Sequence, residues 1–162
     1  MAGSVDDESM EAKDIAIRIA RFDDAGRIAA AYSAWGYGGG IAPGDTAWLA
    51  EASGELIGVV RVAAEHGTLV LRGMRIAEQW RRLGIGARML TTVGLWLDGR
   101  ECYCVPYTHL VPFYGQIGFV EIADDDAPTF LSSRVTEYKH RSLDVRIMVR
   151  PALSMRRSVG PR

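Results

Sequence analysis

The chain has 162 residues, 48% of them hydrophobic and 24% charged, and its net charge is -1. This composition is typical of one globular domain with its own core, and the lack of excess basic charge argues against nucleic-acid or membrane partners. No apolar run is long enough to span a bilayer, and the acidic, polar N-terminus is unlike a secretory signal. We therefore expect a cytoplasmic protein.

Apolar spacing and turn residues predict an α/β chain with one domain over residues 15–150, preceded by a flexible leader (1–14) and followed by a flexible tail (151–162). Short alternating or branched runs predict strands over residues 15–19, 46–50, 56–63, 68–76, 101–105, 118–122 and 143–149. Helical spacing predicts helices over residues 25–35, 82–97, 110–117 and 129–140. A glycine-rich loop that contains Tyr37 is expected over residues 36–44.

A glycine turn, Arg81-Arg82-Leu83-Gly84-Ile85-Gly86, lies between a predicted strand and the clearest predicted helix. A helix N-terminus offers unpaired N–H groups and a positive dipole end, and glycines let a ligand come close to the backbone. The turn lacks the Gly-Lys-Ser/Thr ending of a P-loop, and Met89 occupies the place of the third glycine of a dinucleotide fingerprint. Taken alone, the turn predicts a phosphate site at a helix start.

The same turn resembles the GNAT motif Arg/Gln-x-x-Gly-x-Gly/Ala, with Arg81, Gly84 and Gly86 at its fixed positions. Downstream, residues 113–119 (Phe-Tyr-Gly-Gln-Ile-Gly-Phe) resemble the family signature aromatic-Tyr-x-x-x-Gly-Phe. Two motifs in this order are more specific than either alone. The resemblance implies a single GNAT-type α/β domain, with a mixed, mostly antiparallel sheet splayed between strands four and five and flanked by helices.

The resemblance also implies acetyl-CoA as co-substrate, with no metal. In GNAT enzymes a bulge in strand four leaves main-chain groups free for the pantetheine arm and the thioester, and the N–H groups of the turn hold the pyrophosphate. Carried over to this sequence, the cofactor-binding residues are Met74, Arg75, Ile76, Arg81, Arg82, Leu83, Gly84, Ile85, Gly86 and Ala87.

The implied reaction is direct attack of an amine on the thioester, with Tyr114 at the family's position for the general acid. The identity of the general base is left open, because the glutamate that some relatives carry on strand four is missing from this sequence. His109 is the preferred candidate beside Glu78, His66 and a chain of water molecules. Tyr107 stands where many relatives have a cofactor-contacting asparagine, which puts that contact in doubt.

Two residues are expected at the acceptor: Arg72, which together with Arg75 would form a carboxylate clamp, and Tyr37, in an aromatic-walled lid. The alternative for these two arginines is a structural ion pair with a neighbouring acid such as Glu51 or Glu65. These features favour a small, amino-acid-like amine acceptor. Protein lysine or N-terminal acetylation, a non-catalytic acyl-CoA-binding module, and another phosphate ligand at the same turn remain alternatives. The resemblance also implies a homodimer, because GNAT proteins are often dimers.

Overall fold

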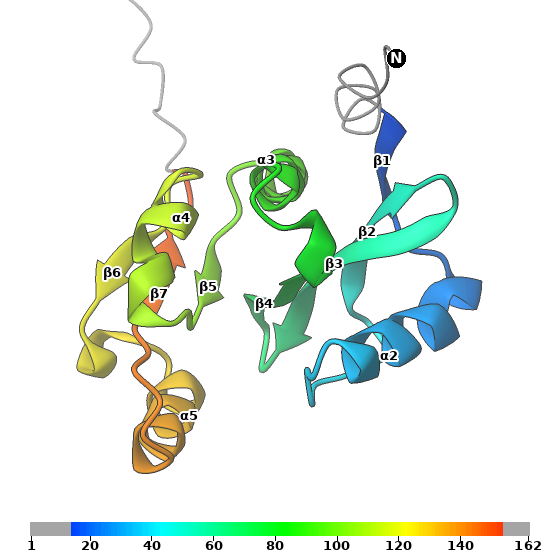
Figure 1. Cartoon of the computed structure of the whole chain (residues 1–162). Coiled ribbons are helices and arrows are strands. Elements are labelled where there is room, and N and C mark those ends of the chain that lie inside the picture. Colours follow the sequence, from blue (N-terminus) through cyan, green and yellow to red (C-terminus); the bar gives the residue numbers. More distant parts are fainter. Residues whose placement is uncertain (1–13, 154–162) are drawn as a thin grey trace, which may run out of the picture. The chain divides into compact units, whose positions relative to one another are not determined.

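The computed structural model describes residues 14–153, which form two compact units (Figure 1). The first unit ends at Trp96 and the second begins at Leu97. The predicted leader (1–14) and tail (151–162) lie almost entirely outside the described residues.

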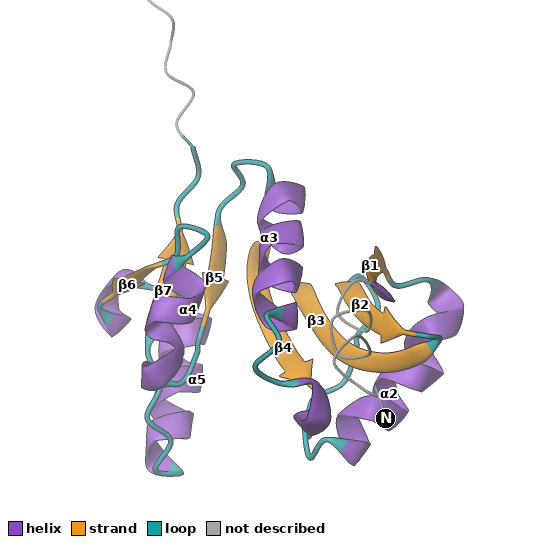
Figure 2. Cartoon of the chain, turned by 45° about the horizontal axis from the view of Figure 1, so that its top comes forward, coloured by secondary structure: helices purple, strands orange, loops and turns teal. Residues whose placement is uncertain are grey.

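The first unit contains four antiparallel strands in chain order: β1 (Ile15–Ile19), β2 (Thr46–Ala52), β3 (Glu55–Glu65) and β4 (Thr68–Ile76) (Figure 2). The predicted bounds of β1 and β4 are confirmed, whereas β2 and β3 extend beyond the predicted strands. The two tight turns, Ser53-Gly54 and His66-Gly67, consist of residues with positive φ. Such turns match the twist of a hairpin and so hold the strands in register.

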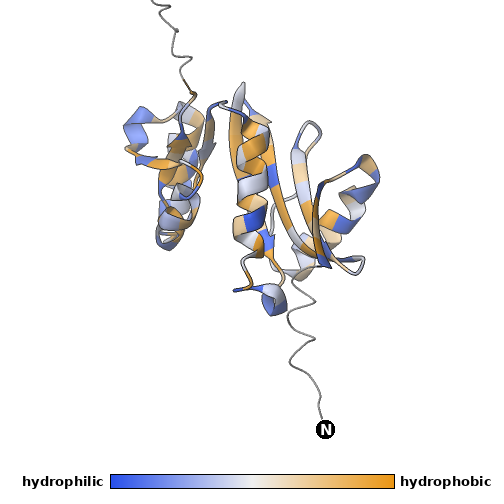
Figure 3. Cartoon of the chain, turned by 90° about the horizontal axis from the view of Figure 1, so that it is seen from above, coloured by the Kyte–Doolittle hydropathy of each residue, from blue (hydrophilic) through white to orange (hydrophobic). Residues whose placement is uncertain are grey.

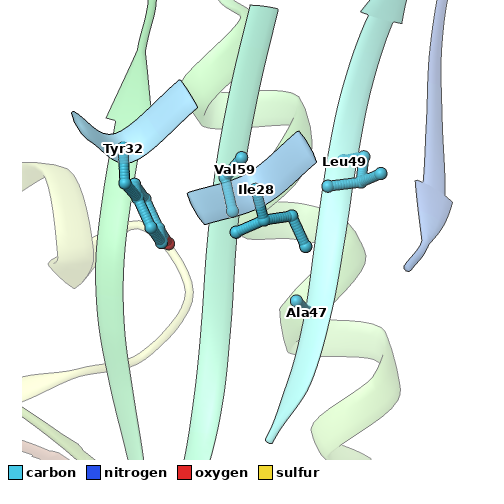
Figure 4. Close-up of a cluster of buried hydrophobic side chains, with 5 residues drawn as sticks. All are labelled: Ile28, Tyr32, Ala47, Leu49 and Val59. Atoms are coloured by element: carbon cyan, nitrogen blue, oxygen red, sulfur yellow. The ribbon is translucent and has the colours of Figure 1, made fainter. Parts of the chain in front are cut away.

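Two helices, α2 (Ala25–Ala34) and α3 (Ile85–Leu97), cover opposite faces of this sheet, and α3 is hydrophobic along most of its length (Figure 3). A short 3-10 helix, η2 (Phe22–Asp24), precedes α2. The core beneath α2 is formed by Ile28, Tyr32, Ala47, Leu49 and Val59 (Figure 4). On the other face, the rings of Trp48 and Trp96 meet edge to face with centroids 5.1 Å apart. Since both faces are covered, residues 47–50 are all buried and read as a continuous apolar run.

The prediction that the second helix of this unit begins at Arg82 is wrong, because α3 begins at Ile85. Arg82 and Gly84 have φ values of 66° and 77°, and a right-handed helix cannot pass through this left-handed region. The chain therefore makes a separate turn between the 3-10 helix η3 (Glu78–Trp80) and α3.

The second unit contains a three-stranded antiparallel sheet in the order β5-β7-β6, in which β7 (Ile147–Arg150) pairs with β5 (Cys102–Cys104) and with β6 (Val120–Ile122). Its helices are α4 (Val111–Gly115), preceded by η4 (Thr108–Leu110), and α5 (Thr129–His140), preceded by η5 (Asp124–Asp126). The bounds of α5 are confirmed, whereas β7 begins four residues later than predicted. This unit holds the second sequence signature on α4 and the residues that follow it.

Candidate active site

The N-terminus of α3 presents unpaired backbone donors. The first N–H of this helix to find a backbone acceptor belongs to Arg88, which donates to the carbonyl oxygen of Gly84 at 3.1 Å. The N–H groups of Ile85, Gly86 and Ala87 are therefore left without an intrahelical partner, as the geometry of an α-helix requires. Together with the positive end of the helix dipole, these groups suit a phosphate oxygen.

The turn that leads into α3 is open above Gly84. A Cβ built there meets nothing within 4 Å, so only its φ of 77° requires glycine, and the space above the backbone is free for a ligand. Arg81 and Arg82 are exposed beside it, and Arg81 Nε donates to the carbonyl oxygen of Ile76 at 3.1 Å. That bond ties the turn to the end of β4. Free N–H groups, open space and two arginines fit the pyrophosphate of coenzyme A.

Strand β4 carries the bulge that the resemblance implies. Val59 pairs with Arg75 but Arg61 pairs with Arg72, so β4 has one extra residue in this interval. The extra residue falls around Gly73, whose φ is 64°.

The bulge lies beside the main chain predicted to bind the cofactor, Met74 to Ile76. The N–H of Ala77 donates to Ile57 O at 2.8 Å. Because bonded and non-bonded pairs alternate along an antiparallel ladder, the N–H of Arg75 also points toward β3, whereas that of Ile76 points to the opposite edge of β4. Of these two predicted main-chain donors, Arg75 is therefore directed toward β3 and Ile76 away from it.

In the second unit, Tyr114 is buried at 7% exposure on α4. Its ring makes edge-to-face contacts with Phe113 and Phe119, at centroid distances of 5.0 and 6.2 Å. The aromatic residues of the second signature thus form one packed group that fixes the orientation of the phenol. Cys102 and Cys104 are both buried on β5.

The three candidate bases differ in position. His109 is exposed on η4 and stacks on Tyr107, with ring centroids 5.9 Å apart. Glu78 is exposed at the start of η3, next to the cofactor turn. His66 lies in the β3–β4 turn, at the other end of β4 from Ile76, and at about 3.3 Å per residue it is roughly 30 Å from the cofactor turn.

The two residues predicted at the acceptor lie on β4 and in the loop after α2. Arg72 donates to Glu65 at 2.7 Å, which supplies the ion pair of the alternative interpretation. Tyr37 packs against the ring of Tyr32 at 4.6 Å and beneath the guanidinium of Arg75, whose Cζ is 4.7 Å from its centroid.

Sequence reasoning missed Arg61, which is only 4% exposed on β3. Its Nη1 donates to Asp45 at 2.9 Å and its Nη2 to the hydroxyl of Tyr37 at 3.4 Å. Burial lowers the pKa of Arg61, but the bond to Tyr37 and the charge of Asp45 outweigh this and leave the pKa raised, so the group stays charged. A single arginine in a predicted strand does not indicate from the sequence that Asp45 and Tyr37 bind it.

A pocket of about 460 Å³ lies in the first unit between the start of α2 and the end of the glycine-rich loop. It is lined by Ala20, Arg21, Phe22, Ala25, Ile41, Ala42, Pro43, Gly44, Asp45 and Ala47. None of the predicted catalytic, cofactor-binding or substrate residues is among them. Within residues 14–153, no group of three or more potential metal ligands comes together, and none of the helices described there is long and apolar enough to cross a bilayer.

Residues 43–121 match the model of the acetyltransferase (GNAT) domain family. N-acetylglutamate synthase from Neisseria gonorrhoeae, complexed with coenzyme A and N-acetyl-glutamate, is similar with a TM-score of 0.61 and 18% identity over 86% of this chain. The present chain spans only 35% of the length of that synthase.

Two shorter proteins are similar over nearly their whole length. The ribosomal-protein-S18-alanine N-acetyltransferase from Escherichia coli has a TM-score of 0.63 and 13% identity, over 91% of this chain and 99% of its own. Arabidopsis thaliana Naa50, in complex with a bisubstrate analogue, has a TM-score of 0.58 and 12% identity, over 84% of this chain and 97% of its own.

A search of curated proteins finds no match to this sequence. At the identities of the solved structures, likeness establishes the fold, which is α/β and of the GNAT type. The family model adds the match over residues 43–121, which contains both sequence signatures. Residues 43–121 are therefore identified as an acetyltransferase domain of the GNAT type, in a chain that has the GNAT fold.

Proposed function

We propose that this protein is an N-acetyltransferase that moves an acetyl group from acetyl-CoA to a primary amine on a small or amino-acid-like molecule. The observation that carries the proposal is the row of unpaired N–H groups at the start of α3, beneath the open turn at Gly84. A backbone cradle of this kind, inside a region that matches the GNAT family, suits the pyrophosphate of coenzyme A.

In this proposal the N–H groups of Leu83 to Ala87 hold the pyrophosphate, and Arg82 adds positive charge from an exposed position. Arg81 contributes by tying the turn to the carbonyl oxygen of Ile76. The main chain of Met74 to Ile76 contacts the pantetheine arm. Because the N–H of Arg75 points toward β3, the N–H of Ile76 is the preferred donor to the thioester oxygen.

The chemistry needs two proton transfers. An aliphatic ammonium has a pKa of about 10, so the amine must lose a proton before it attacks the thioester carbon. The negative charge that develops on the thioester oxygen is stabilised by a backbone N–H. We assign the protonation of the leaving thiolate to Tyr114, because a phenol donates a proton while it is itself neutral at physiological pH. His109 or a chain of water molecules takes the proton from the amine.

We assign Tyr37 and Arg72 to the acceptor site. Arg61 and Arg72 pair directly across β3 and β4, so their side chains share one face of the sheet, and Tyr37 accepts a hydrogen bond from Arg61. This concentration of arginines beside an aromatic ring supports a small anionic or amino-acid-like acceptor. Cytoplasmic location and a homodimer stay predictions.

A second candidate function is acetylation of a protein or peptide N-terminus or lysine. The observation in its favour is that one similar structure is a ribosomal-protein N-acetyltransferase, and that another contains a bisubstrate analogue that joins coenzyme A to the residues MVNAL. A non-catalytic acyl-CoA-binding module is the third candidate, since the fold alone does not fix an activity.

The experiment that separates these candidates measures thiol release from acetyl-CoA over a panel of amino acids, polyamines, aminoglycosides and peptides. Release with small amines supports the proposal, and release with peptides alone supports the second candidate. Calorimetric titration with coenzyme A, ATP and NAD runs beside it. Binding of coenzyme A without release on any amine indicates the binding module, and equal binding of all three compounds contradicts a coenzyme A site.

A further inference from the structure

The glycine-rich loop after α2 covers an arginine-rich part of the sheet in the first unit. Val59 pairs with Arg75, and Val59 belongs to the core beneath α2. Directly paired residues place their side chains on the same face of a sheet, and so do residues two apart on one strand. Arg61, Arg72 and Arg75 therefore all lie on the face that α2 covers.

Two of these three arginines are neutralised and one is not. Arg61 pairs with Asp45 at 2.9 Å, and Arg72 pairs with Glu65 at 2.7 Å. Arg75 has no carboxylate partner within the part of the chain that the structure describes. Its Nη1 donates to the carbonyl oxygen of Met74 at 3.1 Å. A half-buried guanidinium that lacks a counter-ion favours an anion supplied by a ligand.

A second observation at the same place concerns the Nε atom of Arg61. This nitrogen is buried and has no hydrogen-bond partner among residues 14–153, although Nη1 and Nη2 of the same group bind Asp45 and Tyr37. Buried polar groups are almost always hydrogen-bonded in native structures, so an unpaired N–H donor needs an explanation. An acceptor oxygen that arrives with a ligand provides one.

Tyr37 contacts both Arg61 and Arg75. Its hydroxyl accepts the hydrogen bond from Arg61, and its ring lies 4.7 Å from the Cζ of Arg75. Both guanidinium groups thus contact one tyrosine side chain. The loop over residues 36–44 contains five glycines, which permit the backbone to move aside when a ligand enters.

We infer that the acceptor of the proposed acetyl transfer carries a carboxylate, which Arg75 binds through its guanidinium and Arg61 through Nε once the loop has moved. The role of the ligand as an acceptor rests on the proposed function, whereas the carboxylate site itself is testable by binding. A guanidinium donates two parallel hydrogen bonds to the two oxygens of a carboxylate. An amide or ester is neutral and therefore does not form the same charge-assisted pair.

The kinetic test compares L-amino acids with their carboxamides as acceptors in the thiol-release assay. Glutamine has only the α-carboxylate, isoglutamine only the side-chain carboxylate, and glutamic diamide neither, so the three compounds show which carboxylate is required. We expect the wild-type protein to prefer at least one acid over the diamide by tenfold or more in kcat/KM. Equal use of acids and diamide overturns the inference while leaving the proposed function intact.

Two variants locate the site. Arg75→Met keeps the aliphatic stem on Tyr37 but removes the charge, and should raise KM for the preferred acid at least tenfold more than it raises KM for the diamide. Arg61→Lys keeps a cation for Asp45 but removes Nε, and should raise the same KM by a smaller factor. Arg141→Met is the matched control, because Arg141 also lies over a tyrosine ring, that of Tyr138, at 6.0 Å. A parallel rise for acid and diamide in Arg75→Met contradicts the inference.

A binding measurement keeps the inference testable if no amine is acetylated. Calorimetric titration of glutamate and of glutamic diamide into the protein saturated with coenzyme A should give binding of the acid alone, lost in Arg75→Met. Glutamate binding without turnover supports the carboxylate site and counts against the proposed function. Turnover of amines without any preference for a carboxylate supports the proposed function and counts against the carboxylate site. If glutamate does not bind, the carboxylate site is overturned.

Discussion

The hydroxyl group of Tyr32 donates a hydrogen bond to the carbonyl oxygen of Gly73 at 2.8 Å, and this contact joins α2 to the bulge in β4. Tyr32 is 1% exposed, and burial raises the pKa of its phenol, so the hydroxyl stays protonated and able to donate. The bulge in turn precedes the β4 residues predicted to contact the cofactor. The position of that main chain therefore depends on a helix that carries none of the proposed cofactor-binding residues.

Gly73→Ala should destabilise the protein and also weaken coenzyme A binding. A Cβ at this position lies 2.5 Å from the Tyr32 hydroxyl, and the φ of 64° is unfavourable for alanine. Gly54→Ala is the control, because Gly54 has a φ of 80° and nothing within 4 Å of its Cβ. Conformational strain alone costs about 1–2 kcal/mol, and the clash at Gly73 adds about 1–3 kcal/mol. Urea denaturation measures both variants, and equal destabilisation contradicts the proposed clash.

Arg82→Gly should separate folding from cofactor binding. Arg82 has a φ of 66°, so glycine relieves backbone strain while adding chain entropy to the unfolded state, and we expect the free energy of unfolding to change by less than about 1 kcal/mol. The lost charge should raise the Kd of coenzyme A on the order of tenfold, the value of one charge-assisted hydrogen bond.

Two controls accompany Arg82→Gly. Ser142→Gly relieves a similar φ of 61° in the second unit and should leave the Kd unchanged. Pantetheine, which has no phosphate, should bind Arg82→Gly and wild type equally. An equal loss of affinity for pantetheine and coenzyme A means that Arg82 supports the turn by some means other than charge.

Most elements of this fold are readable in the sequence because their ends carry clear signals. Helix α5 begins directly after Pro128, and β4 is bounded by the turn at Gly67, so both have their predicted limits. The start of α3 was predicted three residues too early, since apolar spacing continues through Leu83 and no pattern shows that Arg82 and Gly84 adopt positive φ. Left-handed residues are set by the surrounding structure as much as by their own type.

The candidate site was predictable where it depends on backbone and motif, and not where it depends on partners far apart in sequence. The cofactor turn follows from a short run of neighbouring residues. Arg61 and Asp45 are sixteen residues apart, and only the pairing of β2 with β3 brings them together. For the same reason the sequence alone does not show that Arg72 lies beside Glu65.

Stability should fall at acid pH through the carboxylates that bind Arg18. The Arg18 guanidinium and the backbone N–H of Arg21 hold the pKa of Asp24 well below its ordinary value of 3.8. Burial acts to raise the pKa of Glu51, but hydrogen bonds from Arg18 and Arg27 outweigh it and lower the pKa. A carboxyl group whose pKa is lowered on folding stabilises the protein above its unfolded pKa, and that stabilisation is lost as the pH falls through the folded pKa.

Arg18→Met tests this linkage. We expect the variant to be less stable than wild type near pH 7, with the difference shrinking between about pH 5 and pH 2 as the carboxylates become protonated. Urea denaturation midpoints across this range measure it. Arg141→Met, which removes an arginine stacked on Tyr138, should give a difference from wild type that does not vary with pH. A constant gap for Arg18→Met would mean that Arg18 acts through packing alone.

Tyr114→Phe should lower turnover and leave cofactor affinity unchanged. Phenylalanine keeps the ring and its edge-to-face contacts with Phe113 and Phe119, so α4 should retain its packing. The variant loses only the hydroxyl that is proposed to protonate the leaving thiolate, and general acid catalysis of this kind is worth about 10²–10⁴-fold in rate. Single-turnover thiol release measures the chemical step, and calorimetric titration measures the Kd of coenzyme A.

Two further comparisons give the Tyr114 result its meaning. Tyr138→Phe removes a hydroxyl from α5 in the same unit and should change neither rate nor affinity. An acyl donor whose thiolate leaves readily, such as acetyl-thiophenol, needs less protonation, so Tyr114→Phe should lose less activity with it than with acetyl-CoA. If Tyr114→Phe turns over acetyl-CoA at the wild-type rate, or loses both donors equally, the hydroxyl is not the general acid and a water molecule must supply the proton.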